Sequence, residues 1–361
     1  MKKYKVLCFF LCIGLICTPV YAFAKEGLSW EIVSDEKASD TDDADTDDEN
    51  DSSGEDGDSS DEKEDEDGIE DKDEDDEDNE DEDDEDDEDE DDEDDGHAYP
   101  SGNIYSDSEV QEMISDKYDE LKEAYEIEDK FKRTKTVDSI DSFILNFSKD
   151  PLKGKKIAFL GDSITAGTGG TLTPDGSGLN YTDFIAKYTS AKIVNLGHGG
   201  SPIQGKDDNY AVVYRYTDIP KDSDIIVIFA GINDLFEGSE SFGSLEHPER
   251  GTYCGDTLTT FQMIHKRHPD AEVYVVITYP NKMEDYKEYT GESFQDYADI
   301  QIELAEKYDF HVINLYEEGF LDSHDSRVRN AFFKDDIHPD DLGSEALGRH
   351  ILVHLIKDYV D

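Results

Sequence analysis

Residues 156–165 are KIAFLGDSIT, a short apolar run that gives way at once to small and polar residues. A run of this length that ends at a turn residue is typical of a strand buried on both faces of a parallel sheet. Similar runs, rich in β-branched residues, occupy residues 191–196, 224–230, 272–278 and 310–315. The sequence therefore predicts five buried strands that run parallel to one another.

Helical segments are expected between these strands, at residues 179–189, 253–268 and 293–308, with a final helix from about 341 to 359. Strands that alternate with helices form a parallel sheet with helices on both faces. In such sheets the active site lies at the carboxyl ends of the strands. The residues that follow each strand are therefore the candidates for chemistry.

Four groups of polar and small residues follow the predicted strands. Gly161-Asp162-Ser163 comes after the first strand, and the glycine-rich segment 197–200 follows the second. Asn233 follows the third strand, and an Asp-x-x-His sequence, residues 335–338, follows the fifth. A hydroxyl, a glycine turn, an amide and an acid–imidazole pair are thus expected at one edge of the sheet.

This set of blocks resembles the SGNH, or GDSL-type, hydrolases, a family named for the Ser, Gly, Asn and His of four sequence motifs. The resemblance covers roughly residues 151–361 and keeps the blocks in the family's order. Ile164 replaces the Leu of the GDSL string and Ile232 replaces a common Thr, but neither position carries a catalytic group. The resemblance implies a flavodoxin-like three-layer α/β/α sandwich with a parallel sheet. No Gly-x-Ser-x-Gly elbow occurs in the sequence, which disfavours the α/β-hydrolase fold.

The resemblance also assigns a catalytic triad. Ser163 would be the nucleophile, and its hydroxyl needs a base to attack at neutral pH. His338 would be that base, since an imidazole with an ordinary pKa of about 6.5 is neutral at pH 7. Asp335 would orient the imidazole and fix its tautomer. Asp336 is the alternative orienting acid.

The same resemblance places the oxyanion hole at the Ser163 N–H, the Gly200 N–H and the side-chain amide of Asn233. Gly200 is expected to lack a side chain so that its amide can approach the oxyanion closely. Gly197 and Gly199 remain alternatives for this role. Asp234, the residue after Asn233, is expected to brace the loop in which both lie.

Residues 1–24 have the pattern of a signal peptide. Lys2, Lys3 and Lys5 precede an apolar run at 6–16, and cleavage is expected after Ala24 or, failing that, after Ala22. The alternative is an uncleaved membrane anchor, which would keep the protein in the cell envelope rather than secreted and extracellular. Three of the four cysteines lie in this segment, so Cys254 alone would remain after cleavage.

Residues 25–98 form an acidic low-complexity linker. The net charge of the chain is −61, and residues 41–95 alone contain 40 Asp or Glu against 2 Lys. Such a segment cannot bury enough apolar surface to fold, so we expect it to be disordered. Loose binding of divalent cations is a candidate role for it. The charge excludes nucleic acid and anionic membranes as partners.

Residues 99–150 are expected to be a helical lead-in to a catalytic domain at 151–361. No Pro or Gly interrupts the stretch from Ser106 to about Lys135, and its apolar residues recur at helical spacing. Ser106 or Ser108 could cap this helix. Its apolar stripe should pack on the catalytic domain.

No cofactor and no metal site are expected. His350 and His354 stand one helical turn apart, and His265 and His268 are three residues apart, but no Cys or Glu-x-x-His context accompanies either pair. We therefore interpret these four residues as surface or packing histidines.

The expected reaction is hydrolysis of a carboxylic ester through an acyl-enzyme. The leading substrate hypothesis is deacetylation of a carbohydrate, so the partner would be a small-molecule or polysaccharide ester. No stable membrane partner is expected. The alternatives are a lipid esterase or lysophospholipase, a thioesterase, and a catalytically inactive surface binding protein.

Overall fold

The computed structural model describes residues 8–10, 19–21, 97–98, 104–174, 176–205, 210–236, 241–282, 284 and 291–359. The chain divides into two units, Met1–Asp92 and Glu93–Asp361. In the first unit, the short strands β1 (Cys8–Phe10) and β2 (Pro19–Tyr21) pair antiparallel. In the second, β3 (His97–Ala98) pairs antiparallel with β4 (Ile104–Tyr105).

Residues 25–96 of the acidic linker and most of the predicted signal peptide lie outside the described residues, whereas His97 and Ala98, at the end of the linker, form β3 and are not disordered as expected. Both assignments, and the cleavage sites at Ala22 and Ala24, therefore stay predictions. Within the described ranges, no helix combines the length and the apolar character needed to cross a membrane.

The predicted parallel sheet is confirmed, but the expectation that all five strands are buried is wrong for its two edge strands, residues 192–197 and 311–314, which are largely half-buried or exposed. The sheet consists of β5 (Lys156–Gly161), β6 (Lys192–Gly197), β7 (Ile225–Phe229), β8 (Glu272–Ile277) and β9 (His311–Asn314). All five strands are parallel, in the order β6-β5-β7-β8-β9. This places β5 between β6 and β7, with Gly161 beside Gly197 and Phe229 at the carboxyl edge.

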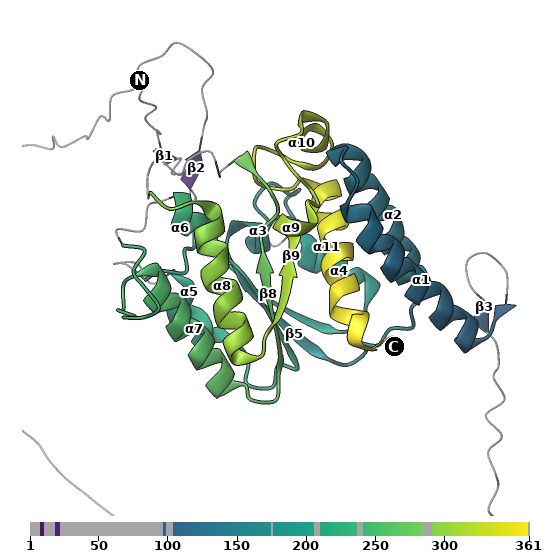
Figure 1. The fold of residues 1–361 in the computed structure, drawn as a ribbon, viewed down its shortest axis with the longest axis horizontal. Coiled ribbons are helices and arrows are strands. Elements are labelled where there is room, and N and C mark those ends of the chain that lie inside the picture. The colour runs from purple at the N-terminus through teal and green to yellow at the C-terminus, as the bar shows by residue number, and fades with distance from the viewer. Residues whose placement is uncertain are drawn as a thin grey trace, which may run out of the picture. The chain divides into compact units, whose positions relative to one another are not determined.

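Helices cover both faces of the sheet (Figure 1). The four predicted helices are present as α4 (Tyr181–Tyr188), α7 (Tyr253–Arg267), α8 (Phe294–Tyr308) and α11 (Asp341–Ile356), the last followed by a 3₁₀ turn. Five short helices were not predicted: α3 (Ser163–Ala166), α5 (Val212–Arg215), α6 (Ile232–Phe236), α9 (Leu315–Glu318) and α10 (Ser326–Phe332). Three of these, α3, α6 and α9, begin within three residues of a strand's end.

The alternation of side chains along each strand divides the core into two layers. Ile157 and Phe159 of β5 face one layer, which also contains buried residues of α4 and α11. Ala158 and Leu160 face the other, together with buried residues of α7 and α8. Because both faces are covered, the central strands carry almost no polar side chains, as the apolar runs predicted.

The lead-in contains two helices instead of the single helix expected over residues 106–135. Helix α1 spans Asp107–Tyr125 and starts with a capping box, in which the Ser106 side chain accepts the Glu109 N–H. Helix α2 spans Lys130–Phe147, and the carboxylate of its N-cap residue, Asp129, accepts the Lys132 N–H. This cap starts a new helix and lets the chain reverse, so that α1 packs against α2.

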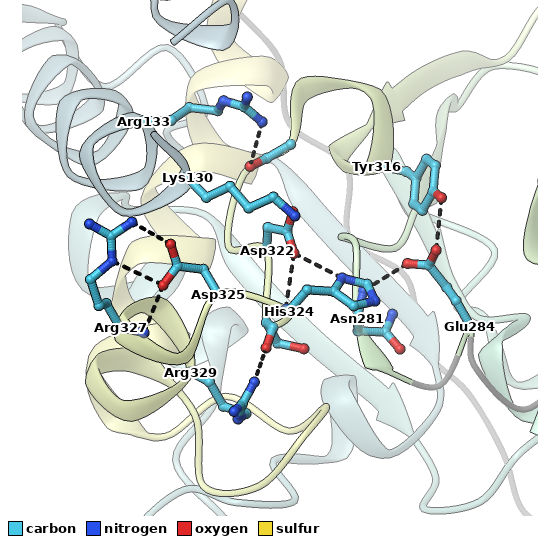
Figure 2. Close-up of polar contacts among 12 residues, drawn as sticks. Lys130, Arg133, Asn281, Glu284, Tyr316, Asp322, His324, Asp325, Arg327 and Arg329 are labelled. Atoms are coloured by element: carbon cyan, nitrogen blue, oxygen red, sulfur yellow. Dashed lines mark hydrogen bonds and ion pairs between the residues drawn. The ribbon is translucent and has the colours of Figure 1, made fainter. Parts of the chain in front are cut away.

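Both lead-in helices pack on residues 151–361, the predicted catalytic domain, as expected. Val137, Ile140 and Ile144 of α2 share a buried cluster with Ile351 and Leu352 of α11. The Tyr118 hydroxyl donates a hydrogen bond of 2.8 Å to the Val353 carbonyl, again on α11. At the start of α2, Lys130 forms an ion pair of 2.6 Å with Asp322, and Arg133 donates to the Gly319 carbonyl (Figure 2).

The packing of α2 yields a prediction about stability. Ile144 is fully buried against the catalytic unit, so Ile144→Ala should lower the free energy of unfolding by about 2–5 kcal/mol. Asn146→Ala, at an exposed position of the same helix, should change it by less than about 0.5 kcal/mol. Urea unfolding of both variants measures the difference. Equal stabilities would show that α2 adds nothing to the core.

Candidate active site

Ser163 occupies the first position of helix α3, at the end of β5. Asp162 is the N-cap of this helix, and its Oδ1 accepts the Ile164 N–H at 3.0 Å. Glycines make room for the helix: a Cβ on Gly161 would lie 2.0 Å from Thr165 Oγ1, and a Cβ on Gly197 would lie 2.3 Å from the Ala166 nitrogen. Ser163 is thereby fixed at the carboxyl edge, with 7% of its surface exposed.

The structure brings together the three residues predicted to form the triad. The Nε2 atom of His338 lies 3.0 Å from the Oγ of Ser163. The Nδ1 of His338 lies 2.8 Å from Oδ2 of Asp335, whose Oδ1 accepts the His338 backbone N–H. Burial raises the pKa of Asp335, but the hydrogen bond and charge of His338 outweigh it and hold this pKa below the usual range. Asp335 therefore stays ionised beside the imidazole.

Asp336, the alternative orienting acid, points away from the imidazole. Its carboxylate lies 3.3 Å from Arg329 and 3.4 Å from Lys282, and its carbonyl accepts the Ser323 hydroxyl at 2.7 Å. These contacts tie the loop to Arg329, Lys282 and Ser323. Asp336 thus supports the loop, and Asp335 is the one of the two carboxylates that contacts the imidazole.

The loop that carries His338 is closed on itself. The Lys334 N–H donates to the His338 carbonyl at 2.8 Å, and Phe333 forms a bridge with Pro339. The hydroxyl of the buried Tyr279 donates to the Ile337 carbonyl at 2.5 Å. Hydrogen bonds to the carbonyls of Ile337 and His338 therefore hold the backbone that carries the imidazole.

Gly200 and Asn233 lie on neighbouring loops at the same edge. The Ser201 N–H donates to the His198 carbonyl at 3.2 Å, which closes a turn with Gly200 at its third position. Gly200 has φ +72°, a conformation that favours glycine, and the Asn233 side chain donates to the Ser201 carbonyl at 3.1 Å. A Cβ on Gly200 would meet no protein atom within 4 Å, so the φ value of the turn is the feature of the fold that favours glycine here.

Arg215 is a residue at this edge that sequence analysis missed. Its guanidinium donates to the Gly161 carbonyl at 2.8 Å, the Leu196 carbonyl at 2.6 Å and the Ser201 hydroxyl at 2.7 Å. It therefore ties the ends of β5 and β6 to the turn that carries Gly200. A single Arg within the short helix α5 belongs to no motif, so nothing in the sequence marked it.

Two buried carboxyl groups lie beneath the site. Burial raises the pKa of Asp162 to about 6, although the Ile164 N–H hydrogen bond opposes this. Burial also raises the pKa of Asp234 to about 7, against hydrogen bonds from the Ile203 and Gln204 N–H groups of 2.7 and 2.9 Å. Asp234 braces the loop, as expected.

The remaining candidates of the sequence lie outside this set. Cys254 is buried, and burial raises the pKa of its thiol to about 11, so it stays protonated at neutral pH. His265 is exposed and His268 is buried. His350 is fully buried, and its ring contacts the carboxylates of Asp141 and Glu318.

A profile of the GDSL-like Lipase/Acylhydrolase family matches residues 159–346. This range is more than half of the chain and contains the triad, Gly200 and Asn233. Among curated proteins, none is significantly similar in sequence to this chain.

Solved structures are similar to the chain. One protein of known crystal structure is 24% identical to this chain in sequence, and the match covers 58% of this chain and 99% of that protein. The TM-score is 0.51, so the two proteins share the same fold. A protein from Lactobacillus plantarum is 22% identical, with a TM-score of 0.48, over 57% of this chain and 98% of its own. A lipase/acylhydrolase from Enterococcus faecalis is 21% identical, with a TM-score of 0.42, over 57% of this chain and 96% of its own.

The raised pKa of Asp162 predicts a pH-dependent effect of Asp162→Asn. The pKa of Asp162 is about 6 in the folded protein, and that of an Asp in an unfolded chain is about 3.9. Between these two values the carboxyl group is ionised in the unfolded state but still protonated in the folded state. The free energy of unfolding of the wild type therefore falls as the pH rises through this range. The Asn variant can keep the cap but carries no charge. Its free energy of unfolding relative to wild type should therefore increase from pH 4 to pH 8, by about 1.4 kcal/mol per pKa unit. Urea unfolding at both pH values measures this, and a constant difference would contradict it.

Proposed function

The chain belongs to the GDSL-like lipase/acylhydrolase family and is a carboxylic ester hydrolase, and we propose that Ser163 is its nucleophile, His338 its general base and Asp335 the acid that orients the base. The observation that carries this proposal is the continuous chain of contacts from Ser163 Oγ through the imidazole to Asp335, of 3.0 and 2.8 Å. The catalytic roles that follow are part of the proposal.

In the acylation step, the Ser163 oxygen attacks the ester carbonyl carbon while its proton passes to Nε2 of His338. Asp335 accepts a hydrogen bond from the Nδ1–H of the same ring, which leaves Nε2 unprotonated and able to act as the base. The imidazolium then protonates the leaving alcohol as the C–O bond breaks. A water molecule, deprotonated in turn by His338, releases the acid from Ser163.

The negative charge of the tetrahedral intermediate is stabilised by N–H donors at the edge of the sheet. The N–H groups of Ser163 and Gly200 make no backbone hydrogen bond within the described residues, so both are available. Ser163 is also the first residue of a helix, where N–H groups have no partner inside the helix. The Asn233 amide donates one N–H to the Ser201 carbonyl, and its second N–H completes the hole.

Ser163→Ala tests the nucleophile. The variant cannot form an acyl-enzyme, so kcat on p-nitrophenyl acetate should fall by about 10⁴-fold or more, with the unfolding transition unchanged. Labelling by a fluorophosphonate should disappear with it. Ser190→Ala, at an exposed serine outside the site, should behave as wild type. Labelling that persists in Ser163→Ala would contradict the assignment, and a wild type that neither labels nor turns over esters would favour an inactive binding protein.

For the substrate, we favour an acetylated carbohydrate. The rings of His198 and Tyr210 stack with centroids 4.2 Å apart and an interplanar angle of 17°. Tyr210 is 54% exposed, and His198 belongs to the turn that carries Gly200. A flat aromatic surface beside the oxyanion hole suits the apolar face of a sugar ring. Such a surface would hold the alcohol part of the ester and leave the acyl part small.

A lipid ester is the second candidate, because two leucines near His338 are exposed. Leu172 is 76% exposed and Leu342 is 61% exposed. They follow Thr171 and Asp341, which are joined by hydrogen bonds of 2.7 and 2.6 Å. Leu172 and Leu342 each follow one member of this hydrogen-bonded pair, and their exposed side chains offer apolar surface to an acyl chain.

Tyr210→Ala distinguishes these substrates. On acetylated xylan fragments, kcat/KM should fall by about tenfold because the sugar loses its aromatic surface, while turnover of p-nitrophenyl acetate should change by less than about twofold. Tyr210→Phe should retain activity on both. An unchanged value on acetylated xylan, with faster turnover of long-chain p-nitrophenyl esters, would instead favour a lipid substrate.

We further propose that the protein is exported by residues 1–24, and that residues 25–98 are a solvated tether in front of the lead-in. The basic start, the apolar run and the small residues at Ala22 and Ala24 support export. The secreted protein should begin at Lys25 or Phe23 by N-terminal sequencing.

Deletion of residues 25–96 should change p-nitrophenyl acetate turnover by less than about twofold, because none of the proposed catalytic residues lies there. A large loss of turnover would mean that the tether contributes to the enzyme.

A further inference from the structure

A second cluster of titratable side chains lies outside the triad, where the lead-in meets the last helix. His350 and His354 stand one turn apart on α11, and Glu318 is the last residue of α9. Asp141 reaches the cluster from α2 of the lead-in. Asp141 and His350 are fully buried, so the cluster is an internal feature of the fold.

The two histidines and Glu318 present three ligand atoms at short range. The Nε2 of His350 lies 2.9 Å from Oε2 of Glu318, and the Nε2 of His354 lies 3.2 Å from Oε1 of the same carboxylate. All three ligand groups lie within 4.8 Å of one another, and no other such group of His, Cys, Asp or Glu occurs among the described residues. Around a tetrahedral zinc ion with bonds of about 2.0–2.1 Å, neighbouring ligand atoms are about 3.3 Å apart. The two histidine–carboxylate distances, 2.9 and 3.2 Å, are close to that value, and the two histidine ligand atoms lie within 4.8 Å of each other.

Asp141 holds His350 in the orientation that a metal ligand needs. Its Oδ2 lies 2.8 Å from Nδ1 of His350 and so accepts the proton of that nitrogen. Histidines that bind metal almost always donate their other ring N–H to a carboxylate or carbonyl in this way. The interaction directs Nε2, the remaining nitrogen, toward Glu318 and His354.

Several polar atoms of the cluster are buried without a hydrogen-bond partner. They are Nε2 of His354, Oδ1 of Asp141 and the hydroxyl of Tyr125, whose ring stands edge-on 6.1 Å from His350. Nε2 of His354 is near Glu318 but lacks the alignment of a hydrogen bond. Buried polar atoms are seldom unsatisfied in folded proteins, and an ion or water is a common reason when they are. A cation bound by His354 and carrying a water would satisfy such atoms.

We propose that Glu318, His350 and His354 bind one divalent transition-metal cation of the zinc type, with Asp141 as the supporting carboxylate. Two histidines and a carboxylate are a recurrent zinc ligand set, which leaves the fourth position to water. Because Glu318 belongs to α9 and both histidines belong to α11, the metal would join these two helices, and the Asp141–His350 hydrogen bond links the site to α2 of the lead-in. Its role is structural, and ester hydrolysis at Ser163 does not pass through it.

The full chain, stripped with a chelator, tests this site with Zn²⁺ and Co²⁺ as probes. Excess Ca²⁺ is present throughout, because this hard cation takes oxygen ligands and saturates the acidic linker. One Zn²⁺ per chain should survive desalting and raise the melting temperature. Co²⁺ should give the intense visible absorption of a four-coordinate site, which carboxylate and water ligands alone do not produce.

Matched variants separate the cluster from the linker. His354→Ala should lose the retained Zn²⁺, the Co²⁺ absorption and the zinc-dependent rise in melting temperature, while His265→Ala, at an exposed histidine of α7, should keep all three. Asp141→Asn should weaken Zn²⁺ binding by about 10–100-fold. If His354→Ala unfolds, His354→Asn gives the same comparison. Equal metal retention by wild type and the His354 variants, or no cobalt absorption in the wild type, would overturn the proposal.

Discussion

The position of Ser163 depends on how closely helix α3 approaches the ends of β5 and β6. Gly161 and Gly197 allow this approach, because a Cβ at either position would lie within 2.3 Å of an atom of α3. Arg215 then fixes the two strand ends with hydrogen bonds to the Gly161 and Leu196 carbonyls. The position of Ser163 relative to the ends of β5 and β6 is thus set by backbone packing and not by the catalytic side chains.

Much of the fold follows from the sequence because its strongest signals are local. Each buried strand is a continuous apolar run, and the sheet order places all five carboxyl ends at one edge. The residues after β5, β6 and β7 could therefore be assigned to one site from the chain alone. Asp335 was preferred to Asp336 by spacing, and in the structure Asp335 is the one that contacts His338.

Contacts between elements that are distant along the chain could not be predicted from the sequence. Arg215 binds backbone carbonyls. Because every residue has a carbonyl, the residue types in the sequence do not reveal these contacts. The partners of His350 lie 209 and 32 residues away, so the pair of histidines on α11 resembled an ordinary packing pair. The break between α1 and α2 depends on Asp129, an unremarkable residue that becomes a cap only when the chain reverses.

The docking of α1 and α2 on α11 also has a consequence for how the chain is made. Tyr118 of the lead-in is synthesised 235 residues before Val353, the residue of α11 to which its hydroxyl donates a hydrogen bond. Until α11 has emerged, the apolar side chains of α2 lack their packing partners on that helix. Contacts of such long range are formed late and slow folding, and exposed apolar stripes are prone to aggregate. A nascent chain of this protein must therefore remain incompletely folded until its final helix is available.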